Sequence, residues 1–113
     1  MLKINREDRA EVTILTLSGH LDALNAPVLK EQAEALVTEG RFQIVFDMAD
    51  LNLIDSSGVG AVVSLYKQVR QRHGDAKIAA LMDQPKEIFK LLRLDRAFDL
   101  APTVDAAIER FAS

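Results

Sequence analysis

The chain has 113 residues, a length that fits one hydrophobic core, so we expect a single domain over residues 1–113. Its 17 acidic and 14 basic side chains give a net charge of −3, which argues against a nucleic-acid surface because such surfaces need clustered positive charge. The lack of cysteine excludes disulfides and thiolate metal sites. No apolar run reaches the roughly 18 residues of a membrane span. The charged start is unlike a signal peptide, so we expect a cytoplasmic protein.

Hydrophobic patterning and turn residues predict strands that alternate with helices. In chain order we expect a short edge strand at 2–6, a charged turn at Glu7–Arg9, a strand at Glu11–Gly19, a loop at 20–25, a helix that ends at Gly40, a strand at Gln43–Met48, a helix over Val59–Arg72, a strand at Lys77–Met82, a helix opened by Asp83 and Pro85, a short strand at Phe98–Leu100 and a last helix after Thr103. Alternation of this kind implies parallel strands joined by crossover helices.

Local signals place the helix ends. Asn25 is a suitable N-cap for the first helix, Pro27 suits its first turn, and Thr103 is a suitable N-cap for the last helix. In the helix opened by Asp83 we expect Ile88, Leu91 and Leu92 to face the core. The fold class is therefore α/β, with a mixed, mostly parallel sheet of four to five strands and about four helices, in which only the N-terminal hairpin is antiparallel.

Enzymatic chemistry has little support in the sequence. His20 and His73 lie 53 residues apart, with no Asp, Glu or His at metal-ligand spacing. Ser56 or Ser57 could be combined with His20 and Asp22 as nucleophile, base and acid, but the Gly-x-Ser-x-Gly elbow of serine hydrolases is absent. We therefore expect no catalytic residue, no cofactor and no metal.

The stretch LNLIDSSGVG, at Leu51–Gly60, joins a buried strand to a helix. A helix start needs one capping side chain, worth about 1 kcal/mol, yet three consecutive residues suited to capping stand here, Asp55, Ser56 and Ser57. The two glycines that follow form a lone Gly-x-Gly without the third glycine of a dinucleotide site. Because ligands and partners meet parallel sheets at the carboxyl ends of the strands, the surplus of polar residues indicates a functional turn.

Five segments of the chain carry a family resemblance. They are Gly19-His20-Leu21-Asp22, the strand QIVFDM, Leu53-Ile54-Asp55-Ser56-Ser57-Gly58-Val59-Gly60, Leu91-Leu92-Arg93-Leu94-Asp95-Arg96-Ala97-Phe98, and the final helix with Ala106 and Ala107. On these segments the sequence resembles the STAS domain over nearly its whole length, and most closely the stand-alone anti-sigma factor antagonists of bacterial partner-switching systems. The Asp-Ser-Ser-Gly segment is the specific part of the resemblance.

The resemblance implies that a cognate kinase phosphorylates Ser56, and that Asp22, Asp55, Ser57 and Gly58 join Ser56 in the partner-binding surface. Asp22 matches the family position near the phosphorylated serine, and a turn-forming aspartate is an equal alternative. Asp55 is expected to cap the helix while it flanks the acceptor. We expect Ser57 to be the helix cap rather than a second phosphorylation site.

The partners implied are an anti-sigma factor that is also an ATP-dependent serine kinase, and a metal-dependent serine phosphatase that reverses the modification. ATP and Mg²⁺ would belong to the kinase, and the chain itself is expected to be a monomer that binds neither nucleic acid nor membrane. Two alternatives stay open: an unphosphorylated STAS subunit of an ABC-type lipid transporter or a signalling scaffold, and a small hydrolase that uses Ser56 or Ser57.

Overall fold

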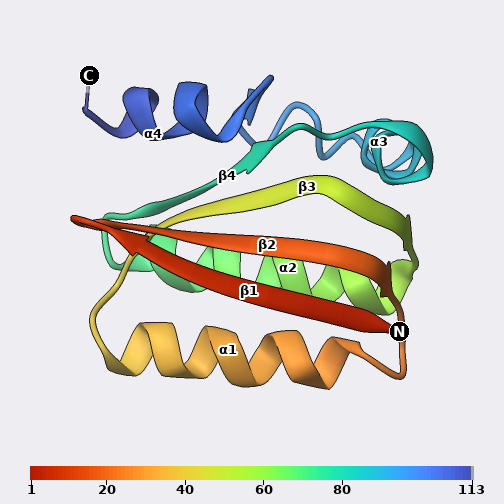
Figure 1. Cartoon of the computed structure of the whole chain (residues 1–113), viewed down its shortest axis with the longest axis horizontal. Helices are drawn as coiled ribbons and strands as arrows, with labels where there is room; N and C mark the ends of the chain where they lie inside the picture. The colour runs from red at the N-terminus through yellow and green to blue at the C-terminus, as the bar shows by residue number, and fades with distance from the viewer. Residues whose placement is uncertain (113) are drawn as a thin grey trace.

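A computed structural model describes residues 1–112, in which five strands form one sheet in the order β1-β2-β3-β4-β5 (Figure 1). The strands are β1 (Leu2–Arg9), β2 (Val12–Leu21), β3 (Gln43–Ile54), β4 (Asp75–Ala79) and β5 (Leu100–Ala101). β1 pairs antiparallel with β2, and every other neighbouring pair is parallel. The expected α/β fold with a mixed, mostly parallel sheet is confirmed.

Helices cover both faces of this sheet. They are α1 (Ala26–Thr38), α2 (Ser56–Gln71), α3 (Asp83–Leu91) and α4 (Val104–Ala112). In Figure 1, α1 lies below the sheet, α2 is seen behind β1 and β2, α4 lies above the sheet, and α3 lies near the end of the sheet where β3 runs into α2. None of the helices within residues 1–112 is long and apolar enough to cross a membrane.

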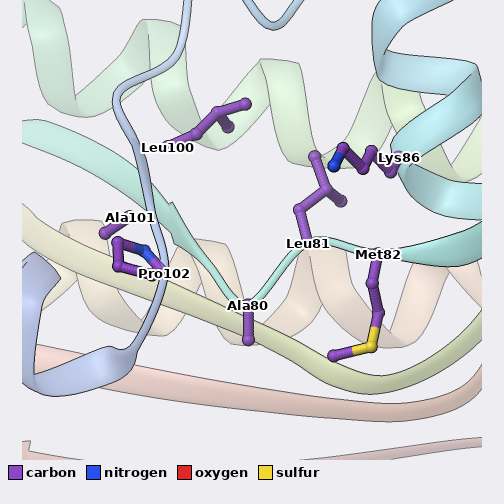
Figure 2. Close-up of a pocket in the computed structure, with 7 residues that line it drawn as sticks. All are labelled: Ala80, Leu81, Met82, Lys86, Leu100, Ala101 and Pro102. Atoms are coloured by element: carbon purple, nitrogen blue, oxygen red, sulfur yellow. The ribbon is translucent and has the colours of Figure 1, made fainter.

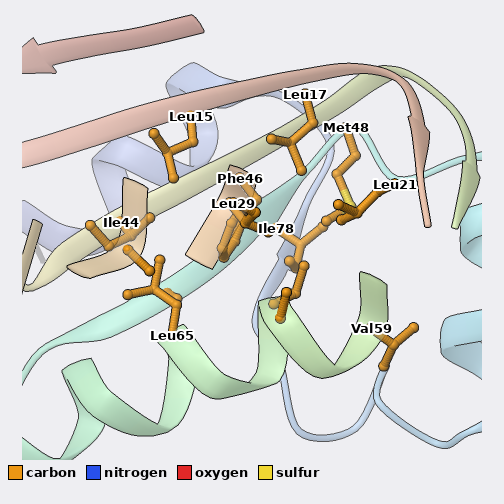
Figure 3. Packing of buried hydrophobic residues seen from close by; sticks show 14 of the residues in the cluster. Leu15, Leu17, Leu21, Leu29, Ile44, Phe46, Met48, Val59, Leu65 and Ile78 are labelled. Atoms are coloured by element: carbon orange, nitrogen blue, oxygen red, sulfur yellow. The ribbon is translucent and has the colours of Figure 1, made fainter. Parts of the chain in front are cut away.

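The core has two parts because side chains of a strand alternate between the faces of the sheet. Leu15, Leu17 and Phe46 point toward α1 and α2, where they meet Leu29 and Leu65 in the larger cluster (Figure 3). Residues of the opposite parity, such as Ile14 and Val45, pack under α4 in the smaller cluster. This two-sided burial explains why the strand QIVFDM is almost wholly apolar.

Two strands are longer than the sequence predicted. The expected turn at Glu7–Arg9 is wrong, since these residues continue β1 and pair with Val12–Ile14 of β2. Their charges are tolerated because an edge strand faces water, and Arg6 binds Asp8 and Glu39 there. β3 continues to Ile54, which pairs with Leu21 after two irregularities in the β2–β3 register.

The inward residues of α3 also differ from expectation. Leu91 and Leu92 are 76% and 50% exposed, whereas Phe89 is fully buried. Buried Pro85 and Phe89 are four residues apart and share one helical face, so the helix ends before Leu92 can return to that face. Arg93 then has φ 59°, which turns the chain out of the helical path.

Candidate functional site

Asp55 begins α2 at the carboxyl end of β3. Its backbone is extended, with φ −110° and ψ −175°, and its Oδ1 accepts a hydrogen bond from the Gly58 amide at 2.9 Å. The Asp55 carbonyl accepts the first helical bond, from the Val59 amide, also at 2.9 Å. Asp55 is therefore the N-cap that the sequence predicted.

The second carboxylate oxygen of Asp55 holds a neighbouring loop. The Ala23 amide donates to Asp55 Oδ2 at 3.1 Å, and the Asp55 amide donates to the Leu21 carbonyl at 3.2 Å. One side chain thus fixes the start of α2 against the connection between β2 and α1. Both of its oxygens are occupied by neutral backbone donors.

Asp22 organises that connection from within. Its Oδ1 accepts hydrogen bonds from the amides of Leu24 and Asn25 at 3.1 and 3.2 Å, and from Asn25 Nδ2 at 3.1 Å. This is the pattern of a turn-forming aspartate. Because the amide of the next residue in the chain, Ala23, binds Asp55 Oδ2, Asp22 also lies close to the Asp55 carboxylate. Asn25 is the first residue before α1, but its side chain makes no capping bond and instead donates to Asp22 and to the His20 carbonyl. Asn25 is therefore the N-cap residue by position, as the sequence predicted, but it makes no side-chain capping bond.

Ser56 and Ser57 are the first two residues of α2, and both are exposed. Within residues 1–112 neither hydroxyl has a hydrogen-bond partner, and neither do their two backbone amides, since a helix start leaves its first amides unpaired. The expectation that Ser57 caps the helix is wrong: Asp55 already fills that role, and Ser57 lies inside the first helical turn. The site therefore presents two free hydroxyls over two free N–H groups.

Gly58 lets the first turn of α2 approach β2 closely. A Cβ atom at this position would lie 2.4 Å from the Leu21 carbonyl oxygen and 2.9 Å from Ile54 Cγ1. Gly60, two residues further along α2, has open space around it. Gly58 is buried, so its structural contribution is this close approach, and contact between Gly58 and a partner stays a prediction.

Gln84, in the first turn of α3, is a part of the site that the sequence did not reveal. Its Oε1 accepts a hydrogen bond from the Ile54 amide at 2.9 Å, and its Nε2 donates to the Ile54 carbonyl at 3.0 Å. Pairing between β3 and β4 stops at Asp47 and Ala79, so the end of β3 pairs with β2 on one side and has no strand on the other. The residues around Gln84 form no local pattern that predicts a hydrogen bond to a residue thirty positions away.

Neither histidine makes a hydrogen bond to Ser56 or Ser57 within residues 1–112. His73 lies beyond the far end of α2, a helix of 16 residues and therefore about 24 Å long. His20 is exposed on β2 and gives no hydrogen bond to Ser56 or Ser57 in the described chain. Across residues 1–112 no three acidic or histidine side chains come together as metal ligands. The arrangement offers neither serine a base.

Ser56 is exposed and is not among the residues that line the pocket at the carboxyl ends of β4 and β5. A pocket of about 330 Å³ lies at the carboxyl ends of β4 and β5 (Figure 2). It is lined by Ala80, Leu81, Met82, Lys86, Leu100, Ala101 and Pro102. None of these residues belongs to the Ser56 turn, whose exposed hydroxyls suit contact with a macromolecule more than enclosure of a small ligand.

Comparison with known proteins identifies the family of the chain. The model of the STAS domain matches residues 3–107. The anti-sigma F factor antagonist of Paenibacillus polymyxa is 29% identical over 105 residues, which cover 92% of this chain and 87% of that protein. The anti-sigma-B factor antagonist of Listeria monocytogenes is 25% identical over 99 residues, which cover 88% of this chain and 86% of the relative.

A solved structure supports the same fold. The crystal structure of an anti-sigma factor antagonist from Mycobacterium paratuberculosis superposes with a TM-score of 0.90 at 24% identity, covering all of this chain and 96% of the other. The names of these relatives denote regulators rather than enzymes.

Proposed function

The chain belongs to the STAS domain family, and we propose that within it the chain is an anti-sigma factor antagonist switched by phosphorylation of Ser56. The observation that carries the proposal is the exposed Ser56 hydroxyl at the start of α2, without a partner in residues 1–112 and beside a carboxylate that caps the helix. An acceptor for a kinase needs this accessibility, and the curated relatives named above are anti-sigma factor antagonists.

A phosphate on Ser56 would leave the fold intact. It adds a charge of about −1.5 to −2 and three acceptor oxygens. The free amides of Ser56 and Ser57 and the positive end of the α2 dipole favour an anion at this place. We therefore expect the modified protein to keep its structure and its new charge to act on whatever binds the turn.

A partner that packs on the turn would feel that charge strongly. It would have to desolvate a dianion beside Asp55, and an unpaired charge buried in an interface costs about 2–5 kcal/mol. That penalty corresponds to a loss of affinity of roughly 30-fold to several thousand-fold. A change of this size converts binding into release.

An apolar side chain beside the acceptor supports binding of a protein partner. Leu24 is 88% exposed, and its amide is fixed by Asp22 next to the Ala23 amide that binds Asp55. Val28, four residues further along in α1, is 43% exposed. Exposed leucine on a fixed loop gives a partner apolar area without the cost of ordering that loop.

In the proposed cycle the unphosphorylated protein binds an anti-sigma factor that is also a serine kinase, and the client of that factor is released. The kinase transfers the terminal phosphoryl group of ATP to Ser56 Oγ, ADP leaves, and the hydroxyl proton is lost to solvent or to a base of the kinase. The modified protein dissociates, and a metal-dependent phosphatase hydrolyses the phosphoserine. Asp22, Asp55 and Ser57 shape the surface that both partners contact.

Phosphoryl transfer by a candidate anti-sigma factor that is also a serine kinase, taken from the same organism, tests the proposal. With ATP, we expect the wild type to gain one phosphate by intact mass, Ser56→Ala to gain none, and Ser57→Ala, the matched control, to gain one. Phosphate on Ser57, or none on the wild type, would contradict the proposed site. Co-purification of the unmodified protein with a transporter ATPase and no kinase would favour the structural-subunit alternative.

A further inference from the structure

We propose that Gln84 is a positioning residue for phosphorylation of Ser56, because its side chain holds the last residue of β3 from the side opposite β2. The inference rests on the proposed function. Its basis is the pair of hydrogen bonds between the Gln84 amide and Ile54, at 2.9 Å to the Ile54 nitrogen and 3.0 Å to its oxygen.

The pair of bonds replaces a missing strand. In a parallel sheet the N–H and C=O of one residue point to the same neighbouring strand, and those of the next residue point to the other. The Asp55 amide binds Leu21 on the β2 side, so the groups of Ile54 point toward the β4 side. β4 is no longer paired there, since its last partner on β3 is Asp47, and the Gln84 amide supplies one donor and one acceptor in its place.

The start of α3 is shaped to present Gln84. Asp83 has φ 58°, a left-handed conformation that aspartate adopts more readily than most residues. Pro85 and Phe89 then anchor the helix in the core. α3 is thus held to the core by two buried side chains, and its Gln84 side chain links it to Ile54.

Ser56 lies two residues beyond Ile54, between two restraints. On one side, Leu21 and Ala23 bind Asp55; on the other, Gln84 binds Ile54. Removing Gln84 would leave the N–H and C=O of Ile54 without a partner and free the turn to move. Phosphoryl transfer depends on the fraction of time in which the acceptor oxygen is aligned for attack, and a displacement of 1 Å can cost about 100-fold in rate. The exposed contact surface would stay the same.

The first test compares Gln84→Leu with Gln68→Leu, the control. Gln68 is a half-buried glutamine on α2 whose side-chain amide donates to the Ser64 hydroxyl. With ATP and the serine kinase that phosphorylates the wild type, we expect Gln84→Leu to lower kcat by about 10- to 100-fold with KM changed less than twofold. We expect Gln68→Leu to match the wild type. Equal kcat for Gln84→Leu and the wild type, or a rise in KM alone, would overturn the role.

A second variant and a second measurement separate positioning from folding. Gln84→Glu keeps an acceptor for the Ile54 amide but places an oxygen opposite the Ile54 carbonyl, so we expect kcat between those of the wild type and Gln84→Leu. Amide hydrogen exchange, measured by NMR well below Tm, should accelerate at Ile54 and Asp55 and stay unchanged in β1 and α4. Uniform acceleration along the chain would overturn the local role. Absence of phosphate on the wild type overturns the proposed function itself, whatever the exchange at Ile54 shows.

Discussion

Two groups of aspartates in this chain are held in opposite ways. Near Ser56, Asp22 and Asp55 accept hydrogen bonds from neutral amides, and neither belongs to an ion pair in the described part of the chain. On the far face of the sheet, Asp75 and Asp99 both bind the ammonium of Lys77, at 3.1 and 3.0 Å. The negative charge of Asp75 and Asp99 is thus neutralised by Lys77, whereas that of Asp22 and Asp55 is not neutralised by an ion pair in residues 1–112.

The Lys77 cluster is built for stability. Lys77 is only 8% exposed, and its Nζ also lies 4.6 Å from the centroid of the Phe111 ring. Asp99 additionally binds Arg110 of α4, so the cluster ties α4 to β4 and to the residue before β5. Each buried charge here has a partner, which is the condition under which burial of charge is tolerated.

The turn at Ser56 has the opposite property. Its carboxylates fix the backbone but leave their negative charge uncompensated, with no lysine or arginine bound to them within residues 1–112. A phosphate added there would meet the free amides of Ser56 and Ser57 beside two carboxylates that have no ion-pair partner in residues 1–112. The contrast teaches that local order does not require local neutrality, and that the unneutralised region is where an added charge reaches a partner.

The largest expected effect tests the charge at the turn. Ser56→Asp should weaken binding to the serine kinase by about 30-fold or more, because the carboxylate must be desolvated in the interface. Ser64→Asp adds the same charge at an exposed position two turns further along α2 and should bind as the wild type does. Isothermal titration calorimetry measures both. Equal affinity for the two variants would rule out expulsion by local charge.

The next effect tests the neutralised cluster. Lys77→Met leaves Asp75 and Asp99 facing each other without their shared cation, and we expect a loss of about 2–3 kcal/mol in the free energy of unfolding, below the 3–5 kcal/mol of fully buried pairs because both carboxylates are partly exposed. Urea unfolding measures it, with the exposed Lys67→Met as control. A loss as small as that of the control would show that the cluster adds little to stability.

A smaller effect is expected at Asp55. Asp55→Ala removes the cap of α2 and the bond to the Ala23 amide, which should cost about 1–2 kcal/mol of unfolding free energy. Asp50→Ala, at an exposed aspartate of β3 with no side-chain bond in residues 1–112, serves as the control. Equal losses of unfolding free energy for Asp55→Ala and Lys77→Met would contradict the expectation that the Lys77 cluster contributes more to stability than the Asp55 cap.

The smallest effect concerns acid. Burial by itself raises the pKa of the Asp99 carboxyl, but the hydrogen bonds and charges of Lys77 and Arg110 outweigh it and hold that pKa below its usual range. The unfolded chain therefore binds a proton before the folded chain does. The stability that Asp99 contributes is complete above about pH 4 and is lost as the pH falls through the lower, folded value. Asp99→Asn should flatten the fall in unfolding free energy below about pH 4, measured in urea; an unchanged slope would contradict the pKa shift.

Local sequence patterns predicted the helix starts and strands of this protein. Asp55 caps α2 where a strand gives way to a helix, and Thr103 caps the last helix through its Oγ1, which accepts from the Ala106 amide at 3.1 Å. β-branched residues and a closing Ser-Gly predicted the strand at Glu11–Gly19, which corresponds to β2. These features depend on residues within a few positions of one another, so spacing alone carries them.

Tertiary contacts decided the rest. Ser57 is not the cap because Asp55 Oδ1 already accepts the hydrogen bond from the Gly58 amide. Leu91 is exposed because the buried face of α3 is the one that carries Phe89. The bonds of Gln84 to Ile54 and of Lys77 to Asp99 join residues 30 and 22 positions apart. Such pairs form only when the sheet brings separate elements together, and no local pattern specifies which side chain will complete an unpaired strand end. The sequence by itself determined where the helix of the Ser56 turn begins, and packing decided what holds it in place.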